Sequence, residues 1–583
     1  MDRISLKKRI VVREPLISLC EFPAEIHPVI RRILATRKLS SPKDLDHSLN
    51  RLPRPQMFLG MDNMVAKLIE AIEQHLRILI VADFDADGAT SCAVAKRGLE
   101  MLGAAEVQYL VPDRFRFGYG LTPEIVEVAS QQQPDFILTV DNGISSLDGV
   151  KAARACGIQV LVTDHHLPGK QLPEADAIVN PNLPGDSFPS KALAGVGVMF
   201  YVLSALRKAL RESGWFQRHS IAEPNLAALL DLVALGTVAD VVELDQTNRI
   251  LVQQGLQRIR RGFAHPGIKA LLQVAGRKLE TLSAADLGFA IGPRLNAAGR
   301  LDNMALGIEC LLSDDYEVAL GMAEQLDCLN QNRREIESRM KEQALSQLSA
   351  EAFQEQGELA AGICLYDETW HQGVVGIIAS RIKDRVHRPV IAFAPVGDGT
   401  IKGSARSVDG IHIRDVLSEI ATLNPHLLNK FGGHAMAAGL SIQWSDFAEF
   451  SSAFDCAIKR HNPDFGAEPV IYTDGELSGA DLTLEFAETL QEIAPWGKGF
   501  PEPQFQGDFE VLDCRVLKDQ HVKFGLRLSG QSLVLDGIAF FADQPQEWLC
   551  VERIRLVYRL AVNEFRNLRK VQLMIEYMEA LSY

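Results

Sequence analysis

ILIVADFDADGAT, residues 78–90, places three carboxylates directly after a short apolar run. The apolar part has the length and β-rich composition of a buried strand, and Gly88 permits a tight turn into the helical pattern that follows. Asp83, Asp85 and Asp87 are therefore expected at the carboxyl end of a strand, where ligands bind in open α/β sheets. Three carboxylates in five residues repel one another, and a divalent cation such as Mg²⁺ or Mn²⁺ removes that repulsion. The alternative for this stretch taken alone is an acidic surface loop.

The same pattern recurs downstream and favours a metal site. Asp141 follows the apolar run DFILTV, and Asp164, His165 and His166 follow IQVLVT. Asp240 follows a helical pattern that contains DLVALG. A lone histidine is more often a core residue, but two adjacent histidines after a strand-end aspartate give a mixed oxygen and nitrogen ligand set that suits Mn²⁺. Two such metals can activate water and stabilise both oxygens of an in-line phosphoryl displacement.

The order of the patterns predicts an α/β fold with several domains. Apolar strands alternating with helical stretches indicate a parallel, helix-covered sheet, and 583 residues exceed the size of a single core. We expect two α/β domains around a cleft, with a C-terminal β-barrel. The predicted parts are a helical lead-in over 1–70, the first α/β domain over 71–315, a polar linking helix over 316–350, the second α/β domain over 351–465 and the barrel over 466–583.

Composition narrows the class of protein. No apolar run of about 18 residues occurs, and the charged N-terminus lacks a signal-peptide pattern. The nine cysteines are scattered without a CxxC pair, which predicts reduced thiols in the cytoplasm. The net charge of −15 argues mildly against nucleic-acid binding, although a cluster of acidic metal ligands adds negative charge that bound cations offset.

The motifs resemble a known family. DFDADG, VDNG, TDHH and GTVAD, in this order, resemble the four motifs of the DHH phosphoesterase superfamily, and GGHAMAAG at 432–439 resembles the glycine-rich motif of its DHH-associated domain. VPDRFRFGYGL, LAGVGVMF, GPRLNAAGRLDN and WHQGVVGIIASR are similar to segments of the RecJ exonucleases. The resemblance implies two Mn²⁺ or Mg²⁺ ions and a barrel of the OB type that grips single strands. The implied metal ligands are Asp83, Asp85, Asp87, Asp141, His165 and Asp240, and His166 joins them in the catalytic set.

One position departs from the superfamily pattern. Many relatives carry a histidine four residues before Asp85, where this chain has Val81. The departure leaves open how many protein ligands the first metal has, and Asp83 can fill part of that role.

Arginines and a glycine-rich segment are the predicted phosphate-binding residues. Guanidinium groups suit phosphate oxygens, and glycines permit close backbone approach. Structural ion pairs and tight packing are the alternatives. Phe115, Phe117 and Tyr119 either stack on bases or belong to the core. The expected phosphate-binding set is Arg114, Arg294, Asn296, Arg300, Arg381, Arg406, Gly433 and His434, with Arg294 and Arg300 flanking a small loop.

The resemblance implies an exonuclease that removes mononucleotides from single-stranded DNA in the 5′ to 3′ direction. It also implies roles in recombinational repair and mismatch repair, with single-strand-binding protein and a repair helicase as partners. The alternatives are a phosphodiesterase for short oligoribonucleotides or cyclic dinucleotides, and a replication scaffold with eroded metal motifs. The motif carboxylates and histidines are all present, which argues against erosion.

Overall fold

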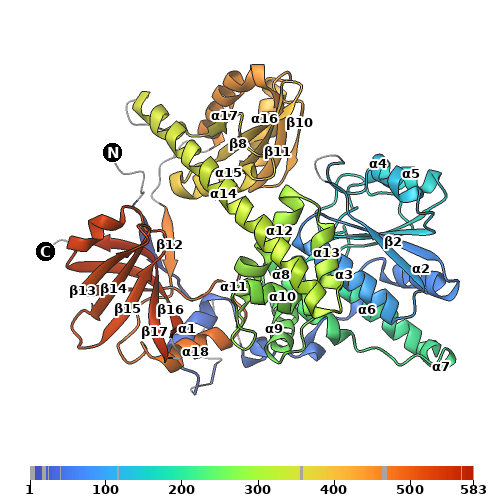
Figure 1. Cartoon of the computed structure of the whole chain (residues 1–583), viewed down its shortest axis with the longest axis horizontal. Coiled ribbons are helices and arrows are strands. Elements are labelled where there is room, and N and C mark those ends of the chain that lie inside the picture. Colours follow the sequence, from blue (N-terminus) through green and yellow to red (C-terminus); the bar gives the residue numbers. More distant parts are fainter. Residues whose placement is uncertain are drawn as a thin grey trace. The chain divides into compact units, whose positions relative to one another are not determined.

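The computed structural model describes residues 7–15, 22–23, 25–39, 41–113, 117–354, 359–461, 469–565 and 568–581 (Figure 1). The chain forms two compact units. One contains Met1–Val12 and Gln331–Tyr472, and the other contains Arg13–Asn330 and Thr473–Tyr583. Helix α14 (Tyr316–Gln354) is the predicted linking helix and continues from one unit into the other. Across these described ranges, no helix is long and apolar enough to span a bilayer. The domain boundaries given above stay predictions.

The larger unit contains the expected parallel sheet. Its strand order is β3-β2-β4-β5-β6, and each neighbouring pair is parallel. The strands are β2 (Arg77–Ala82), β3 (Glu106–Leu110), β4 (Phe136–Val140), β5 (Gln159–Thr163) and β6 (Ala177–Val179). Strand β3 was not predicted, because this edge strand is only partly buried and its sequence, EVQYL, is not a continuous apolar run.

Alternate residues of the central strands face two separate cores. Ile78 and Ile80 pack in the core shared with α2 (Met61–Glu73), α3 (Ala86–Met101) and α6 (Gly195–Glu212). Leu79 and Val81 pack in the core shared with α4 (Pro123–Ser130) and α5 (Leu147–Ala155). This alternation is the two-residue period of a strand. Val81 is fully buried in an apolar core, so its position contributes structure and no metal ligand.

A helical layer continues the larger unit. It comprises α7 (Trp215–Arg218), η5 (Leu226–Leu229), α8 (Leu230–Ala239), α9 (Gln246–Arg260), α10 (Pro266–Val274), α11 (Ala284–Asp286), the π-helix η6 (Leu287–Ile291), α12 (Gly292–Leu301) and α13 (Ala305–Leu312). The prediction that Arg294 and Arg300 flank a loop was wrong, because both lie on α12. Pro293 at the start of that helix has no N–H to lose, and the Leu and Ala residues that follow favour helix.

The smaller unit carries the second sheet, in the order β10-β11-β9-β8-β7, with β7 and β8 parallel and the other pairs antiparallel. This mixed sheet with its helices confirms the second α/β domain. Its elements are β7 (Ile363–Tyr366), α15 (Val375–Val386), β8 (Val390–Gly397), β9 (Thr400–Arg406), α16 (Ile413–Leu423), β10 (Lys430–Gly433), β11 (Ala437–Gln443), η7 (Trp444–Asp446) and α17 (Phe447–His461).

The C-terminal strands close into the predicted barrel, in the order β13-β14-β15-β17-β16. They are β13 (Phe505–Leu517), β14 (His521–Leu528), β15 (Val534–Ala539), β16 (Arg553–Phe565) and β17 (Leu568–Ala580), accompanied by α18 (Leu484–Glu492) and η8 (Pro545–Cys550). The lead-in contains α1 (Pro28–Thr36), η2 (Pro42–Leu45), η3 (Leu49–Arg51) and η4 (Pro55–Met57). It is not purely helical, because β1 (Arg9–Val12) pairs with β12 (Val470–Thr473).

Candidate metal centre and phosphate-binding residues

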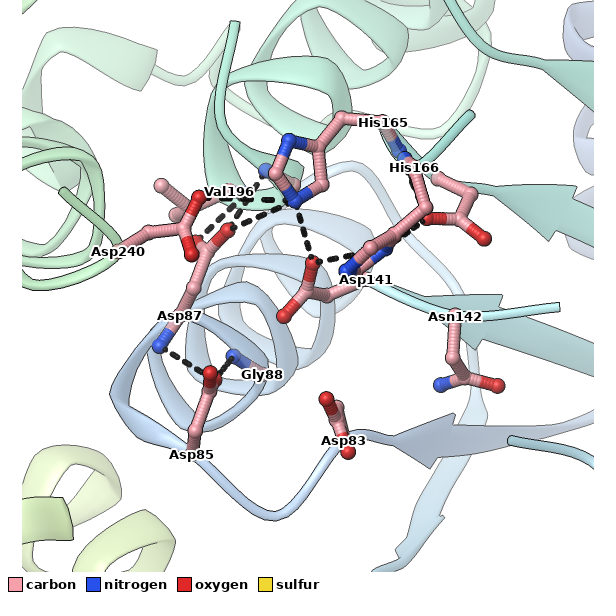
Figure 2. A network of polar contacts seen from close by, with 12 residues as sticks. Asp83, Asp85, Asp87, Gly88, Asp141, Asn142, His165, His166, Val196 and Asp240 are labelled. Atoms are coloured by element: carbon pink, nitrogen blue, oxygen red, sulfur yellow. Dashed lines mark hydrogen bonds and ion pairs between the residues drawn. The ribbon is translucent and has the colours of Figure 1, made fainter. Parts of the chain in front are cut away.

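The carboxyl ends of three neighbouring parallel strands gather the predicted acidic residues. Asp83 follows β2, Asp141 follows β4, and Asp164 follows β5. Asp240 lies at the C-terminus of α8, and its carboxylate lies beside Asp87 and His165 (Figure 2). Parallel strands bring their carboxyl ends to one edge of a sheet, so Asp83, Asp141 and Asp164 meet there, and helix α8 adds Asp240 to the cluster.

The histidine after β5 lies among three of the carboxylates. The Nε2 atom of His165 is 3.1 Å from Asp141 Oδ1, 3.5 Å from Asp240 Oδ2 and 4.0 Å from Asp87 Oδ2. Ligand atoms within 4.8 Å of one another form three overlapping groups. They are Asp83 with Asp85 and Asp141, Asp87 with His165 and Asp240, and Asp141 with His165 and His166.

Burial shifts the titration of this cluster strongly. Burial, followed by repulsion from neighbouring carboxylates, raises the pKa values of Asp87 and Asp141 well above the ordinary range. Burial and the charge of Asp85 raise the pKa of Asp240 to about 7. Burial, followed by the charge of His166, lowers the pKa of His165 to about 4, so His165 is neutral at pH 7.

The orphaned atoms of the cluster fit a divalent cation. Asp141 Oδ1 and His165 Nε2 are buried and make no hydrogen bond, although they face each other. A carboxylate oxygen and the lone pair of a neutral imidazole repel each other unless a proton or a cation lies between them. Carboxylate oxygens with one imidazole form a donor set that Mn²⁺ and Mg²⁺ accept. The residues therefore fit the expected metals.

Backbone amides hold Asp87 in place. Its Oδ2 accepts a hydrogen bond from Gly195 N at 2.7 Å, and its Oδ1 accepts one from Val196 N at 3.0 Å. These amides begin α6, and the N-terminus of a helix stabilises negative charge. A Cβ on Gly195 would lie 2.7 Å from the Asp141 side chain, so only glycine fits between the two carboxylates. Sequence reasoning did not identify these donors, because backbone amides have no side-chain pattern.

The turn after β2 is equally constrained. Asp85 Oδ1 accepts from the amides of Asp87 and Gly88, both at 3.0 Å, and caps α3. A Cβ on Gly88 would lie 2.4 Å from the Asp83 carbonyl oxygen, so the turn requires glycine. Asp141 has a φ of 62°, a left-handed conformation that is uncommon outside glycine and concentrates at functional sites.

Asp164 positions the histidine pair and was not in the predicted ligand set. Its Oδ1 accepts from the amides of His165 and His166 and from His166 Nδ1 at 2.8 Å, and its Oδ2 accepts from Ile144 N at 2.9 Å. Burial lowers the pKa of His166, but the hydrogen bond and charge of Asp164 outweigh burial and raise it to about 9. His166 is therefore a cation at pH 7, and the Tyr119 hydroxyl lies 3.2 Å from its ring nitrogens.

Helix α12 supports the turn that carries Asp83, Asp85 and Asp87 through Asn296. Its Oδ1 accepts a hydrogen bond from Ala86 N at 2.9 Å, inside the DFDADG segment. A Cβ on Gly299 would lie 1.9 Å from the Phe84 carbonyl oxygen, so the helix touches the turn directly. Arg294 forms an ion pair with Asp327 at 2.7 Å, which agrees with the alternative of a structural ion pair rather than a free phosphate ligand. Arg300 lies in the last turn of the same helix.

Among the predicted residues of the smaller unit, Arg406 has the strongest features of a phosphate ligand. It is largely buried and donates to Ser404 Oγ at 3.0 Å and to the Ala405 carbonyl, and burial lowers its pKa. A Cβ on Gly376, at the start of α15, would lie 2.9 Å from its guanidinium and from Ser404 Oγ. Ser404 was not singled out from the sequence.

The remaining predicted residues have different surroundings. Arg381 pairs with Glu337 at 3.0 Å. Gly433 has a φ of +147° and ends β10, and His434 N donates to Ala437 O across the β10–β11 turn.

The segment after β3 contains the predicted arginine and aromatic residues. Arg114 and Phe115 lie outside the described residues. Phe117 packs against the core under α4 and α5, whereas Tyr119 is half exposed beside His166.

Comparison with known proteins matches all three parts of the chain. Sequence models described as the DHH family N-terminal domain, the DHHA1 domain and the RecJ OB domain match residues 77–237, 359–460 and 473–577. The structure is similar to RecJ of Thermus thermophilus in complex with Mn²⁺, with a TM-score of 0.79 and 30% identity, covering 100% of this chain and 81% of that one. The Mg²⁺ complex of that protein gives a TM-score of 0.74 at 28% identity, covering 99% of this chain and 79% of that one.

Curated relatives agree with the structural similarity. A protein of Dickeya dadantii named single-stranded-DNA-specific exonuclease RecJ is 52% identical over 561 residues, which are 96% of this chain and 97% of the relative. The Escherichia coli protein of the same name is 50% identical over 95% of this chain and 96% of the relative. Identity at this level over nearly the full length of both chains establishes that the chain belongs to the RecJ family of DHH proteins, and the strand-end cluster of carboxylates and histidines agrees with that assignment.

Proposed function

We propose that this protein is a metal-dependent exonuclease that hydrolyses phosphodiester bonds of single-stranded DNA and releases mononucleotides from the 5′ end. The observation that carries the proposal is the buried cluster of carboxylates around His165, in which Asp141 Oδ1 and His165 Nε2 lie 3.1 Å apart and neither makes a hydrogen bond. The names of the relatives, which specify single-stranded DNA, support the substrate. The metal-bound RecJ structures support Mn²⁺ or Mg²⁺ as the cofactor.

The proposed roles follow the geometry. Two cations in such a site would activate water and neutralise the charge that develops on the phosphate. Asp83, Asp85 and Asp141 would hold one cation, and Asp87, His165 and Asp240 would hold the other. His166, which carries a positive charge at pH 7, would bind a phosphate oxygen of the strand.

Arg406 is the proposed phosphate ligand of the smaller unit. Its guanidinium is largely buried and hydrogen-bonds Ser404 and a carbonyl rather than a carboxylate in the contacts described above. A buried cation of this kind is stabilised by an anion, and phosphate matches the fork geometry of guanidinium. Arg114, Arg300, Gly433 and His434 remain proposed contacts to the strand, supported by the resemblance alone.

The cellular setting is proposed on the family resemblance. We place the protein in the cytoplasm, in recombinational and mismatch repair, and expect single-strand-binding protein and a repair helicase as partners. Purification of the tagged protein from cells, with and without nuclease treatment, tests these partners. Association that survives removal of DNA supports direct contact, whereas association that is lost with DNA contradicts it.

The activity is tested with two 5′-phosphorylated copies of one long single strand, labelled at the 5′ or the 3′ end. Each copy is incubated with Mn²⁺ and the protein, beside the Asp141→Ala variant, the surface control Asp148→Ala and a matched duplex. The 5′ label should appear at once as mononucleotide while the 3′-labelled strand shortens progressively. Asp141→Ala and the duplex should be inert, and Asp148→Ala should behave as wild type.

The other outcomes separate the alternatives. Release of mononucleotide from the 3′ label at the start of the reaction would reverse the polarity. Survival of long strands with cleavage of dinucleotides would change the substrate class. No cleavage with any divalent metal would favour the scaffold.

A further inference from the structure

A tight turn ahead of the barrel carries an exposed lysine, Lys498, and packs against the segment that follows Asp240 at the C-terminus of α8. Gly497 N donates to Phe500 O at 2.9 Å, and Phe500 N donates to Gly497 O at 3.1 Å, so Lys498 and Gly499 form the tip of the turn. Gly499 has a φ of +71°, which favours glycine at that position. The turn thus presents the Lys498 side chain to solvent.

Packing fixes the base of this turn. Phe500 is 1% exposed, stacks with Trp496 at 5.0 Å between ring centroids and lies 4.4 Å under the Arg249 guanidinium. These contacts immobilise the turn, so the position of Lys498 does not depend on a loose loop.

The turn is attached to the segment that follows Asp240. Leu244 N donates to the Lys498 carbonyl oxygen at 2.8 Å. A Cβ on Gly497 would lie 2.6 Å from the Leu244 side chain, and a Cβ on Gly499 would lie 3.1 Å from Glu243 Cβ. The backbone of the turn therefore lies against residues three and four positions beyond Asp240.

The Lys498 side chain is exposed beside the segment that follows Asp240. Glu243 also lies beside the turn, but among the described residues Lys498 forms no ion pair with a carboxylate within 4.0 Å. A lysine held beside a metal centre without a carboxylate partner is available to an anion.

We propose that Lys498 contacts a backbone phosphate of the bound single strand on the Asp240 side of the metal centre. This inference rests on the proposed nuclease function and adds a contact from the segment that leads into the barrel. The side chain would act as a point charge on a phosphate oxygen, with no role in bond cleavage.

The test measures strand binding as a function of salt. A fluorescent single strand is titrated without divalent metal, so that it is not cut, against wild type, Lys498→Ala, Lys498→Arg and the exposed-lysine control Lys151→Ala. Loss of one phosphate contact should lower the slope of log K against log salt by about 0.7 and raise Kd about three- to tenfold at low salt. Lys498→Arg should restore both values, and Lys151→Ala should change neither.

A chemical cycle locates the contact. Single phosphates of the strand are replaced one at a time by neutral methylphosphonates, and the effect of Lys498→Ala is measured on each strand. The effect should vanish at one position. An equal effect at all positions, or an unchanged slope in Lys498→Ala, would overturn the inference while wild type still cleaves with Mn²⁺. Failure of wild type both to bind and to cleave single strands would instead refute the function on which the inference rests.

Discussion

Two buried carboxylate sites in the larger unit differ in what neutralises them. Asp474 is fully buried, and its oxygens accept from Arg37 at 2.5 and 3.0 Å, from Arg13 and Thr36 at 3.3 Å and from Gln504 N at 3.0 Å. The cluster around Asp141 has comparable burial but gathers several carboxylates around a neutral His165. The first site is complete within the protein, whereas the second needs a cation from outside.

The difference separates a structural site from a functional one. Burial of charge is costly unless the charge is paired and hydrogen-bonded. Asp474 meets that requirement through residues distant in sequence, and it ties the lead-in to the segment before the barrel. Protein groups do not pair all the carboxylates of the Asp141 cluster, and the pKa values of Asp87, Asp141 and Asp240 are therefore raised. Matched Asp→Asn changes at the two sites should therefore have opposite consequences.

The largest effect is expected on activity from Asp141→Asn. Loss of a proposed ligand should reduce Mn²⁺-dependent cleavage at least about a thousandfold, or about 4 kcal/mol in the activation free energy. The same change removes the repulsion between Asp141 and the neighbouring carboxylates, so the metal-free variant should melt at the wild-type temperature or above it. Cleavage rates and calorimetry of the metal-free protein check both parts. A large drop in melting temperature would make Asp141 a structural residue.

Asp474→Asn should show the reverse pattern. The change leaves the Arg37 guanidinium buried without its counter-ion, which typically costs about 3–5 kcal/mol of stability. Denaturant unfolding of the two variants side by side measures the contrast. The affinity for Mn²⁺ of the folded Asp474→Asn protein should equal that of wild type. Weaker metal binding in this variant would contradict the separation of the two sites.

The pH dependence follows from the raised pKa of Asp240, about 7. A raised pKa means that the folded protein binds more protons than the unfolded chain between about pH 4 and pH 7. The metal-free protein should therefore lose stability as the pH rises through this window, and Mn²⁺ should restore it. Because Asp240, and with it Asp87 and Asp141, must lose a proton before the metal binds, the affinity for Mn²⁺ should fall at least about tenfold per pH unit below pH 7. Titrations at pH 5.5, 6.5 and 7.5 measure this slope, and a pH-independent affinity would exclude Asp240 as a ligand.

A smaller effect, on the affinity for Mn²⁺, is expected from Asn296→Leu. The variant loses the acceptor for Ala86 N and should weaken Mn²⁺ binding about tenfold, because a residue that orients ligands contributes to affinity. Asn303→Ala is the matched control, since Asn303 Oδ1 also accepts a backbone hydrogen bond, from Ala305 N, at the start of α13. Calorimetric titration with Mn²⁺ should separate the two variants. Equal affinities would leave Asn296 free for the phosphate contact predicted from the sequence.

The sequence predicted the parallel sheet, the second α/β domain, the barrel and the set of strand-end acids. The signal for each of these features is local, because each apolar run is followed directly by its own polar residues. The parallel topology then brings the strand ends together. The amides of Gly195 and Val196 that hold Asp87 could not be predicted, since they lie 108 and 109 positions away and involve no side chain. The ion pairs of Arg294 and Arg381 depend on helix packing that no local pattern encodes.

The central claim is that the cluster around His165 is a two-metal site. Anomalous diffraction from crystals grown with Mn²⁺, paired with a count of bound ions in solution, tests it most directly. The account predicts two Mn²⁺ ions per chain, one contacted by Asp83, Asp85 and Asp141 and the other by Asp87, His165 and Asp240. Absence of Mn²⁺ from the cluster at saturating concentration, or binding that persists in Asp141→Asn with unchanged stoichiometry and affinity, would contradict it.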